Sequence, residues 1–189
     1  MSDIKKALYA GILVGIGDVV YTILENKYIG SMLFSLALLT VINSQLNLYT
    51  GKIGFYKNYS WRFLVKILFM NLIGILFVCA IFLWARAEIS STVLKIANAK
   101  FADVFFNLFA MGILCGMCMY IAVSNKNQLI SVFSIMVFIL CGFRHCIADF
   151  PFLIVSFSYT NLLKFIMIVL GNSVGSIMIN FLFSDKKAE

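Results

Sequence analysis

The sequence has little of what keeps a protein domain soluble in water. Charged residues make up 12% of its 189 residues, whereas a soluble domain carries about 25%. It has one proline and one histidine but 19 phenylalanines, so disordered and collagen-like chains are excluded as well. Because 62% of the residues are hydrophobic and the mean hydropathy is +1.00, we expect an integral membrane protein.

The chain also lacks the residue clusters that catalysis, metal binding or nucleic-acid binding requires. No nucleotide-binding loop or Ser/His/Asp set is present, and the net charge of +7 comes mostly from the chain ends and the segments between apolar runs. The cysteines all lie in apolar runs, where they predict packing rather than disulfides: Cys79, Cys115, Cys118, Cys141 and Cys146. We therefore expect no enzyme, no cofactor, no metal and no nucleic-acid partner.

Six apolar stretches are long enough to cross a bilayer, for which about 20 residues are needed. They are Ala7–Leu24, Ile29–Leu48, Phe63–Trp84, Val104–Val123, Leu129–Phe152 and Leu162–Phe183. None shows the alternation typical of outer-membrane β-strands, so each is expected to be a helix. The fold class is therefore an all-α membrane protein, with residues 1–189 forming a single transmembrane domain.

The basic residues predict how the chain is oriented. An even number of spans places both termini on one side of the membrane. That side would carry Lys5, Lys6, Lys52, Lys57, Arg62, Lys66, Lys126, Lys186 and Lys187, and the other side Lys27, Arg86, Lys95, Lys100 and Lys164. Because cytoplasmic loops hold the basic excess, we expect a multi-pass protein of a bacterial inner or plasma membrane with cytoplasmic termini.

An internal repeat indicates the architecture. Gly11-Ile-Leu-Val-Gly15 recurs 101 residues later as Gly112-Ile-Leu-Cys-Gly116, and Asn71-Leu-Ile-Gly74 recurs at the same offset as Asn172-Ser-Val-Gly175. The offset lays residues 7–84 over 104–183, with 85–103 as a linker. Three spans per half is an odd number, so the halves would be inverted, which is typical of transporters and channels. The glycine pairs predict close helix contacts.

Two further positions are candidates for breaks in the helices. Thr50 and Gly51 end the second apolar stretch, and Pro151, the sole proline, lies near the end of the fifth. Glycine frees the backbone and proline removes a hydrogen-bond donor. Paired interruptions at membrane depth indicate a transport site, although both positions are equally consistent with ordinary helix ends.

Five segments, taken in order, resemble the formate/nitrite transporter (FNT) family. Gly142-Phe-Arg-His-Cys-Ile-Ala-Asp149 is similar to the fifth-span motif G-F-E-H-S-x-A-N. Phe34-Ser-Leu-Ala-Leu38 with Leu48-Tyr-Thr50 resembles the second-span pattern F-x-L-G-L…L-F-T. The segments Asn71–Gly74, Gly112–Cys115 and Gly171–Gly175 are similar to motifs of the third, fourth and sixth spans.

The resemblance implies a homopentamer with a separate pore through each protomer. It also implies an aquaporin-like fold in which spans two and five are broken at midplane. Such proteins pass small monovalent anions or their conjugate acids, such as formate, nitrite, hydrosulfide, lactate or acetate. By resemblance His145 is the central pore histidine, Thr50 the threonine of the second-span loop and Lys100 a vestibule lysine. Two apolar constrictions would be formed by Phe34, Leu38, Leu48, Tyr49 and Phe138.

The sequence departs from the family pattern at three positions. Arg144 stands where the family has glutamate, and Gly116 and Asp149 stand where it has asparagine. Charges at membrane depth need partners, so we expect Arg144 to pair with Asp18 or Asp149. An Arg144 that faced the pore would instead strengthen anion binding.

These residue types suit the passage of a weak acid through an apolar barrier. A lysine at the mouth concentrates an anion, and an imidazole, whose unperturbed pKa is about 6.5, can donate a proton midway. The hydroxyl of Thr50 can donate a hydrogen bond to the histidine or to the permeant, and apolar constrictions exclude water. Alternatively, His145 packs against a backbone carbonyl and Lys100 is an interfacial lysine. Two other functions are also left open. One is a neutral-solute channel for water, ammonia or hydrogen sulfide, which needs no vestibule cation, and the other is a non-conducting family member, which the three altered positions allow.

Overall fold

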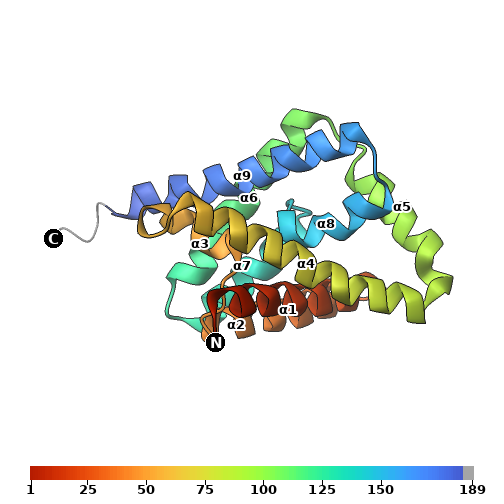
Figure 1. The fold of residues 1–189 in the computed structure, drawn as a ribbon, viewed down its shortest axis with the longest axis horizontal. Helices are drawn as coiled ribbons and strands as arrows, with labels where there is room; N and C mark the ends of the chain where they lie inside the picture. Colours follow the sequence, from red (N-terminus) through yellow and green to blue (C-terminus); the bar gives the residue numbers. More distant parts are fainter. Residues whose placement is uncertain (185–189) are drawn as a thin grey trace.

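The computed structural model describes residues 1–184, and that range is built of helices. They are α1 (Asp3–Ile23), α2 (Lys27–Asn43), α3 (Tyr49–Lys52), α4 (Trp61–Ala85), α5 (Ser90–Lys100), α6 (Phe105–Ser124), α7 (Gln128–Leu140), α8 (Cys146–Val155) and α9 (Tyr159–Ser184) (Figure 1). Two 3-10 segments, η1 (Ile53–Asn58) and η2 (Ala87–Ile89), precede α4 and α5. Lys186 and Lys187, used above to predict the orientation, lie outside the described residues.

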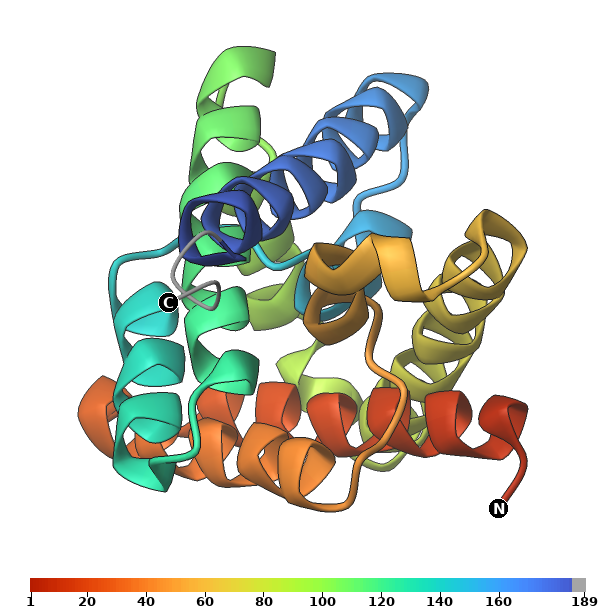
Figure 2. The same ribbon diagram turned by 90° about the vertical axis from the view of Figure 1, so that its left-hand side faces the viewer.

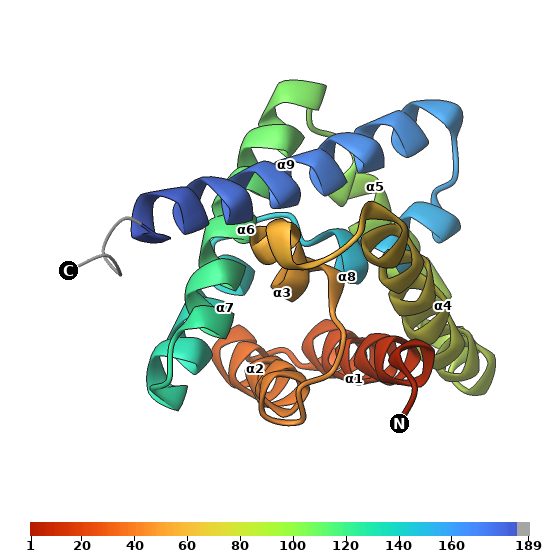
Figure 3. The same ribbon diagram turned by 60° about the vertical axis from the view of Figure 1, so that its left-hand side comes forward.

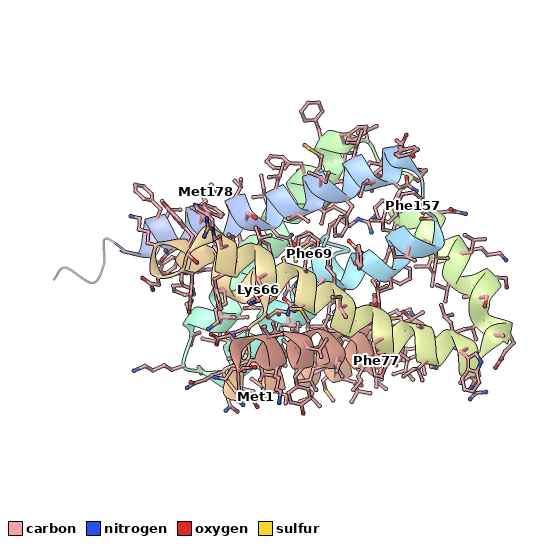
Figure 4. All side chains as sticks on the ribbon, viewed as in Figure 1. Met1, Lys66, Phe69, Phe77, Phe157 and Met178 are labelled. Carbon is pink, nitrogen blue, oxygen red and sulfur yellow. The ribbon has the colours of Figure 1, made fainter. Side chains whose placement is uncertain are left out.

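Four of these helices, α1, α4, α6 and α9, are long and apolar enough to cross a membrane. The predicted spans Ile29–Leu48 and Leu129–Phe152 are each divided into shorter helices, α2 followed by α3 and α7 followed by α8. The outer surface is rich in apolar side chains; Phe69 and Phe77 on α4 are 60% and 58% exposed (Figure 4). A large exposed apolar surface indicates contact with lipid or with another protein, so the chain is described below as a membrane protein.

The short helices α3 and α8 lie in the middle of the molecule, and the longer helices surround them (Figure 3). Helix α1 packs against both α2 and α4, while α6 packs against both α7 and α9. Figure 2 shows α1 and α2 side by side along one side of the molecule. Contacts between α2 and α7 join the two groups of helices.

Glycine allows the long helices to cross closely. A Cβ atom on Gly11 of α1 would overlap the backbone carbonyl of Asn71 on α4. In the same way, a Cβ atom on Gly116 of α6 would overlap the carbonyl of Asn172 on α9. Small residues are how helices pack closely within a bilayer, where no hydrophobic force drives helix against helix.

The first break follows α2 and is made by a helix cap. Helix α2 ends at Asn43, and Gln45 takes a left-handed conformation with φ of 50°. The N–H of Leu46 then donates to the carbonyl of Val41 at 3.0 Å. This bond across a left-handed residue is the Schellman motif, which stops a helix and turns the chain away.

The second break follows α7 and has the same cap. Helix α7 ends at Leu140, and Gly142 has φ of 70°. The N–H of Phe143 donates to the carbonyl of Phe138 at 2.9 Å. Both helices are therefore stopped by the geometry of the two or three residues that follow them.

The breaks do not lie where the sequence pattern placed them. Thr50 and Gly51 belong to α3, beyond the first break, and Pro151 lies inside α8. The prediction that these residues end the second and fifth spans is wrong. The chain has already left the helix at the Schellman motifs. Pro151 is the sixth residue of α8, where it removes one hydrogen-bond donor from the helix without ending it.

Candidate functional site

His145 and Thr50 meet in the interior, at the first turns of α8 and α3. His145 caps α8: its Nδ1 accepts a hydrogen bond from the N–H of Ala148 at 3.2 Å. Because Nδ1 is an acceptor, a neutral ring carries its hydrogen on Nε2, which then donates to Oγ1 of Thr50 at 2.9 Å. The residues are 2% and 1% exposed. The hydroxyl of Thr50 therefore keeps its own hydrogen for another acceptor.

Asn71 of α4 fixes the chain that leads into α3. Its Oδ1 accepts from the N–H of Tyr49 at 2.8 Å, and its Nδ2 donates to the carbonyls of Asn47 at 2.9 Å and Ala7 at 2.7 Å. The asparagine is fully buried. The backbone N–H of Tyr49 and carbonyl of Asn47, which have no helix partner after the first break, are thus hydrogen-bonded without water. Backbone polar groups inside a membrane need such partners.

Asn172 of α9 does the same for the chain that leads into α8. Its Oδ1 accepts from the N–H of Cys146 at 2.9 Å, and its Nδ2 donates to the carbonyls of Arg144 at 2.7 Å and Gly112 at 2.9 Å. Asn172 is also fully buried. The two asparagines hold the segments on which Thr50 and His145 lie, so they position the pair.

Two cavities lie at opposite ends of α2. The first, of about 280 Å³, is lined by Lys27 and Phe34 from the N-terminal half of α2 and by His145; we call it the vestibule. The second, of about 350 Å³, is lined by Val41 and Ile42 from the end of α2 and by Leu48, Gly51, Met119 and Val123; we call it the second cavity. His145 thus lines the vestibule, and Gly51, the chain neighbour of Thr50, lines the second cavity.

An apolar neck separates the cavities. Phe34, Leu38 and Val41 are spaced so that they share one face of α2. Phe34 lines the vestibule, Val41 lines the second cavity, and Leu38 between them is 0% exposed and lines neither. His145, which lines the vestibule, is bonded to Thr50, whose chain neighbour Gly51 lines the second cavity.

Aromatic rings close the vestibule side of the neck. The rings of Phe34 and Phe138 meet edge to face with centroids 6.3 Å apart, and Phe138 stacks on the imidazole of His145 at 5.5 Å. Phe34 and Phe138 are each 2% exposed. A dry aromatic contact of this kind blocks hydrated ions while it is closed.

Leu48 and Tyr49, the other two residues expected to form the constrictions, have different surroundings. Leu48 lines the second cavity, whereas Tyr49 lines neither cavity. The hydroxyl of Tyr49 lies 2.8 Å from Oγ of Ser173 on α9, and the residue is 6% exposed. This bond between α3 and α9 fixes the tyrosine side chain.

The vestibule contains an ion pair that the sequence did not predict. Nζ of Lys100, the last residue of α5, lies 2.6 Å from Oδ1 of Asp149 on α8. The same ammonium lies over the ring of Phe152 at 4.9 Å. The Lys100 side chain is 28% exposed and the Asp149 side chain 2%. Lys100 reaches the vestibule from a segment treated above as a linker.

The expected pairing of Arg144 with Asp18 or Asp149 is wrong. Its guanidinium donates to the carbonyl of Lys100 at 2.6 Å and lies 3.6 Å from Oδ2 of Asp103. A helix C-terminus has unpaired carbonyls and a partial negative charge, both of which attract a cation. The end of α5 therefore attracts Arg144, and Asp149 is left to Lys100.

Asp18 of α1 and Lys27 at the start of α2 also line the vestibule. The sequence indicated Asp18 as a buried charge but gave no reason to include Lys27. Met119 and Val123 of α6, which line the second cavity, were missed as well. They lie in an apolar run of α6, where nothing in the pattern separates a cavity-lining residue from a packed one.

Comparison with known proteins identifies the family and the fold. The sequence model described as "Formate/nitrite transporter" matches residues 3–184. No curated protein sequence matched. Among solved structures, a "Pentameric formate channel with formate bound" superposes with a TM-score of 0.79 at 21% identity, covering 99% of this chain and 97% of that one. An "FNT family ion channel" gives a TM-score of 0.82 at 21% identity, covering 98% and 89%. The chain has the fold of these channels and belongs to the formate/nitrite transporter family.

Proposed function

We propose that the protein conducts small monovalent anions or their conjugate weak acids, of the class that includes formate, nitrite, hydrosulfide and acetate. The observation that carries this proposal is the pair of cavities at opposite ends of α2, separated by a buried apolar neck. Two cavities that approach each other across the apolar side chains of Phe34, Leu38 and Val41 favour a path through the protein. Family membership supports the same function.

Within the neck, the polar contact is the Thr50–His145 pair. A permeant that enters between the rings of Phe34 and Phe138 leaves its water behind, which is costly unless the protein replaces those hydrogen bonds. The hydroxyl hydrogen of Thr50 is available for a permeant oxygen, because its oxygen already accepts from Nε2 of His145. His145 thus orients the threonine, and the permeant makes one hydrogen bond midway through an apolar passage.

We further propose that residues 7–84 and 104–183 are inverted halves of one repeat, joined by the linker 85–103. Asn71 and Asn172 make equivalent sets of contacts, each with one broken span and one long helix. Gly11 faces the Asn71 carbonyl as Gly116 faces that of Asn172. The equivalent of Gly11 in the second half is therefore Gly116. The sequence repeat instead paired Gly11 with Gly112, which lies four residues, or about one helical turn, before Gly116.

The proposal extends to the assembly, which the family supports, and to the orientation, which the basic residues support. We propose a homopentamer with a path through each protomer, because the matched formate channel is pentameric and because helices such as α4 leave large apolar side chains exposed. The excess of basic residues supports cytoplasmic termini. In that orientation the second cavity, which contains Lys52, faces the cytoplasm and the vestibule faces outward.

Uptake into proteoliposomes tests the proposal. Formate, nitrite, hydrosulfide and acetate are each followed by stopped-flow swelling or radiolabel at several pH values, against protein-free liposomes. At least one of the four should enter faster through the protein than through lipid alone. If a correctly assembled oligomer passes none of them, the proposed function is wrong.

A further inference from the structure

A third cavity, which we call the side cavity, lies between α1, α4, α5 and α8. Its volume is about 300 Å³, and its walls include Leu76 and Leu83 of α4 and Val93 of α5. Ala80 of α4 and Ile154 of α8 also line it and are exposed, so it opens on the apolar outer surface of the protomer. An apolar cavity of about 150 Å³ can hold benzene. The side cavity therefore has room for a ring with a short alkyl chain.

The side cavity shares a wall with the vestibule. Asp18 and Thr22 of α1 and Phe152 of α8 line both. Among residues 1–184, Asp18 is the one charged residue that lines the side cavity, and the rest of the lining is apolar apart from Thr22 and Cys79. Apolar walls with a few convergent polar groups are typical of a small-molecule binding site.

The carboxylate of Asp18 has no partner within the protein. No hydrogen bond or salt bridge joins its side chain to any of residues 1–184. Asp18 is 7% exposed, but its oxygens are not fully enclosed, because in that range the one fully enclosed unpartnered side-chain atom is Oδ2 of Asp149. The oxygens of Asp18 therefore reach the cavity surface, where they can accept hydrogen bonds.

The two lysines of the vestibule do not neutralise Asp18. Nζ of Lys100 is held at 2.6 Å by Oδ1 of Asp149. Nζ of Lys27 donates to two backbone carbonyls at the end of α1, at 3.0 and 2.9 Å. A charge at membrane depth is costly without a partner, so a ligand that brings a cation to Asp18 gains binding free energy.

We propose that the side cavity binds amphiphilic organic cations, with their apolar body between α4 and α8 and their ammonium group at Asp18. The carboxylate accepts hydrogen bonds from the ammonium, and the hydroxyl oxygen of Thr22 can accept another. Such a molecule dissolves in the bilayer and reaches the cavity from the lipid, past Ala80 and Ile154. This site is independent of the proposed function, because its ligand does not enter the neck.

The charge of Asp18 distinguishes a cation from other amphiphiles of the same shape. Hydrogen bonds between an ammonium and a carboxylate are roughly twice as strong as those between neutral groups. A neutral alcohol fills the apolar part of the cavity equally well but leaves the charge of Asp18 uncompensated. An anionic amphiphile is repelled by the same carboxylate. The site should therefore select ligands by charge, which an apolar groove alone does not do.

Equilibrium dialysis against the oligomer in phosphatidylcholine nanodiscs tests the proposal, with binding to empty nanodiscs subtracted. Phenylbutylamine, phenylbutanol and phenylbutyrate share an apolar body and are a cation, a neutral molecule and an anion. The wild type should bind the amine about ten-fold more tightly than the alcohol, the difference expected for one charge-assisted hydrogen bond. Phenylbutyrate should bind more weakly than either.

Three variants locate the site. Asp18→Asn keeps the shape of the side chain and removes its charge, so the affinity for the amine should fall about ten-fold while that for the alcohol stays unchanged. Ala80→Phe places a ring at the exposed edge of the cavity and should weaken both. Glu25→Gln is the matched control, because Glu25 is an exposed acidic residue just beyond α1 that does not line the cavity. It should bind as the wild type does.

Equal affinity of the wild type for the amine and the alcohol overturns the proposal, because the cavity is then merely apolar. Amine binding that is undiminished in assembled Asp18→Asn overturns it as well. Binding of none of the three probes also overturns it, and is the result expected if a neighbouring protomer covers the cavity. The comparison of probes on the wild type does not depend on whether the variants fold, and no outcome bears on formate uptake.

Discussion

Replacing Asn172 with alanine should destabilise the protein more than its small change in volume suggests. The asparagine is fully buried, and its side chain bonds the N–H of Cys146 and the carbonyl of Arg144 at 2.9 and 2.7 Å. In Asn172→Ala both groups are left buried without a partner. Each such group costs about 1–3 kcal/mol, so the free energy of unfolding should fall by about 2–6 kcal/mol. The third partner, the carbonyl of Gly112, lies within α6 and contributes little to the loss.

The effect is measured as the apparent Tm of the detergent-purified oligomer. For a chain of this size about 1 kcal/mol corresponds to about 2–4 °C, so Tm should fall by roughly 4–24 °C. Asn107→Ala is the matched control, because Asn107 is an exposed asparagine of α6, and its Tm should stay within about 2 °C of the wild type. An Asn172→Ala protein that melts with the control would refute the claim that this amide holds the second break together.

Three further predictions concern the breaks, the neck and the helix crossings. Gln45→Gly should raise, and Gly142→Ala lower, the free energy of unfolding by about 1 kcal/mol, because both positions are left-handed; equal Tm values for the two variants would contradict this. Thr50→Val should slow formate uptake per assembled oligomer about ten-fold, the equivalent of one hydrogen bond of about 1.4 kcal/mol, and lower Tm by roughly 2–12 °C, because the buried Nε2–H of His145 loses its partner; wild-type uptake would remove Thr50 from the path. Gly116→Val should prevent assembly, because its side chain meets the Asn172 backbone; a normal size-exclusion profile would argue against that crossing.

Local sequence patterns predicted the membrane helices well. Apolar length alone located α1, α4, α6 and α9, because lipid imposes a minimum on each span. Motif order identified the family, and it brought His145 and Thr50 to attention although they lie 95 residues apart. Apolar length is a local property of the chain, and motif order is read directly along it, so neither requires knowledge of the folded structure.

The position of the breaks could not be predicted in the same way. The second break has a glycine at its left-handed residue, Gly142, but the first has Gln45, a residue with no particular preference for that conformation. Because proline and glycine often end helices, the breaks were predicted at Gly51 and Pro151, which lie after the actual breaks at Gln45 and Gly142. Tertiary bonds from Asn71 and Asn172, which no local pattern encodes, hold the chain once it leaves each helix.

The charge pairs were missed because one partner lies on α5. Residues 85–103 are too polar for a span and were taken as a linker, yet their helix ends at Lys100, beside Asp149. Its C-terminal carbonyl and the following Asp103 then attract Arg144. The partners of a buried charge depend on where such a helix docks, which composition does not specify.

The most direct test of the account is formate uptake by Leu38→Ala. Leu38 is 0% exposed and separates the vestibule from the second cavity, so shortening it should open the neck and raise uptake several-fold. Leu64→Ala removes the same atoms from an equally buried leucine that lines neither cavity and should give no gain. Uptake by Leu38→Ala equal to that of Leu64→Ala would contradict a path along this face of α2.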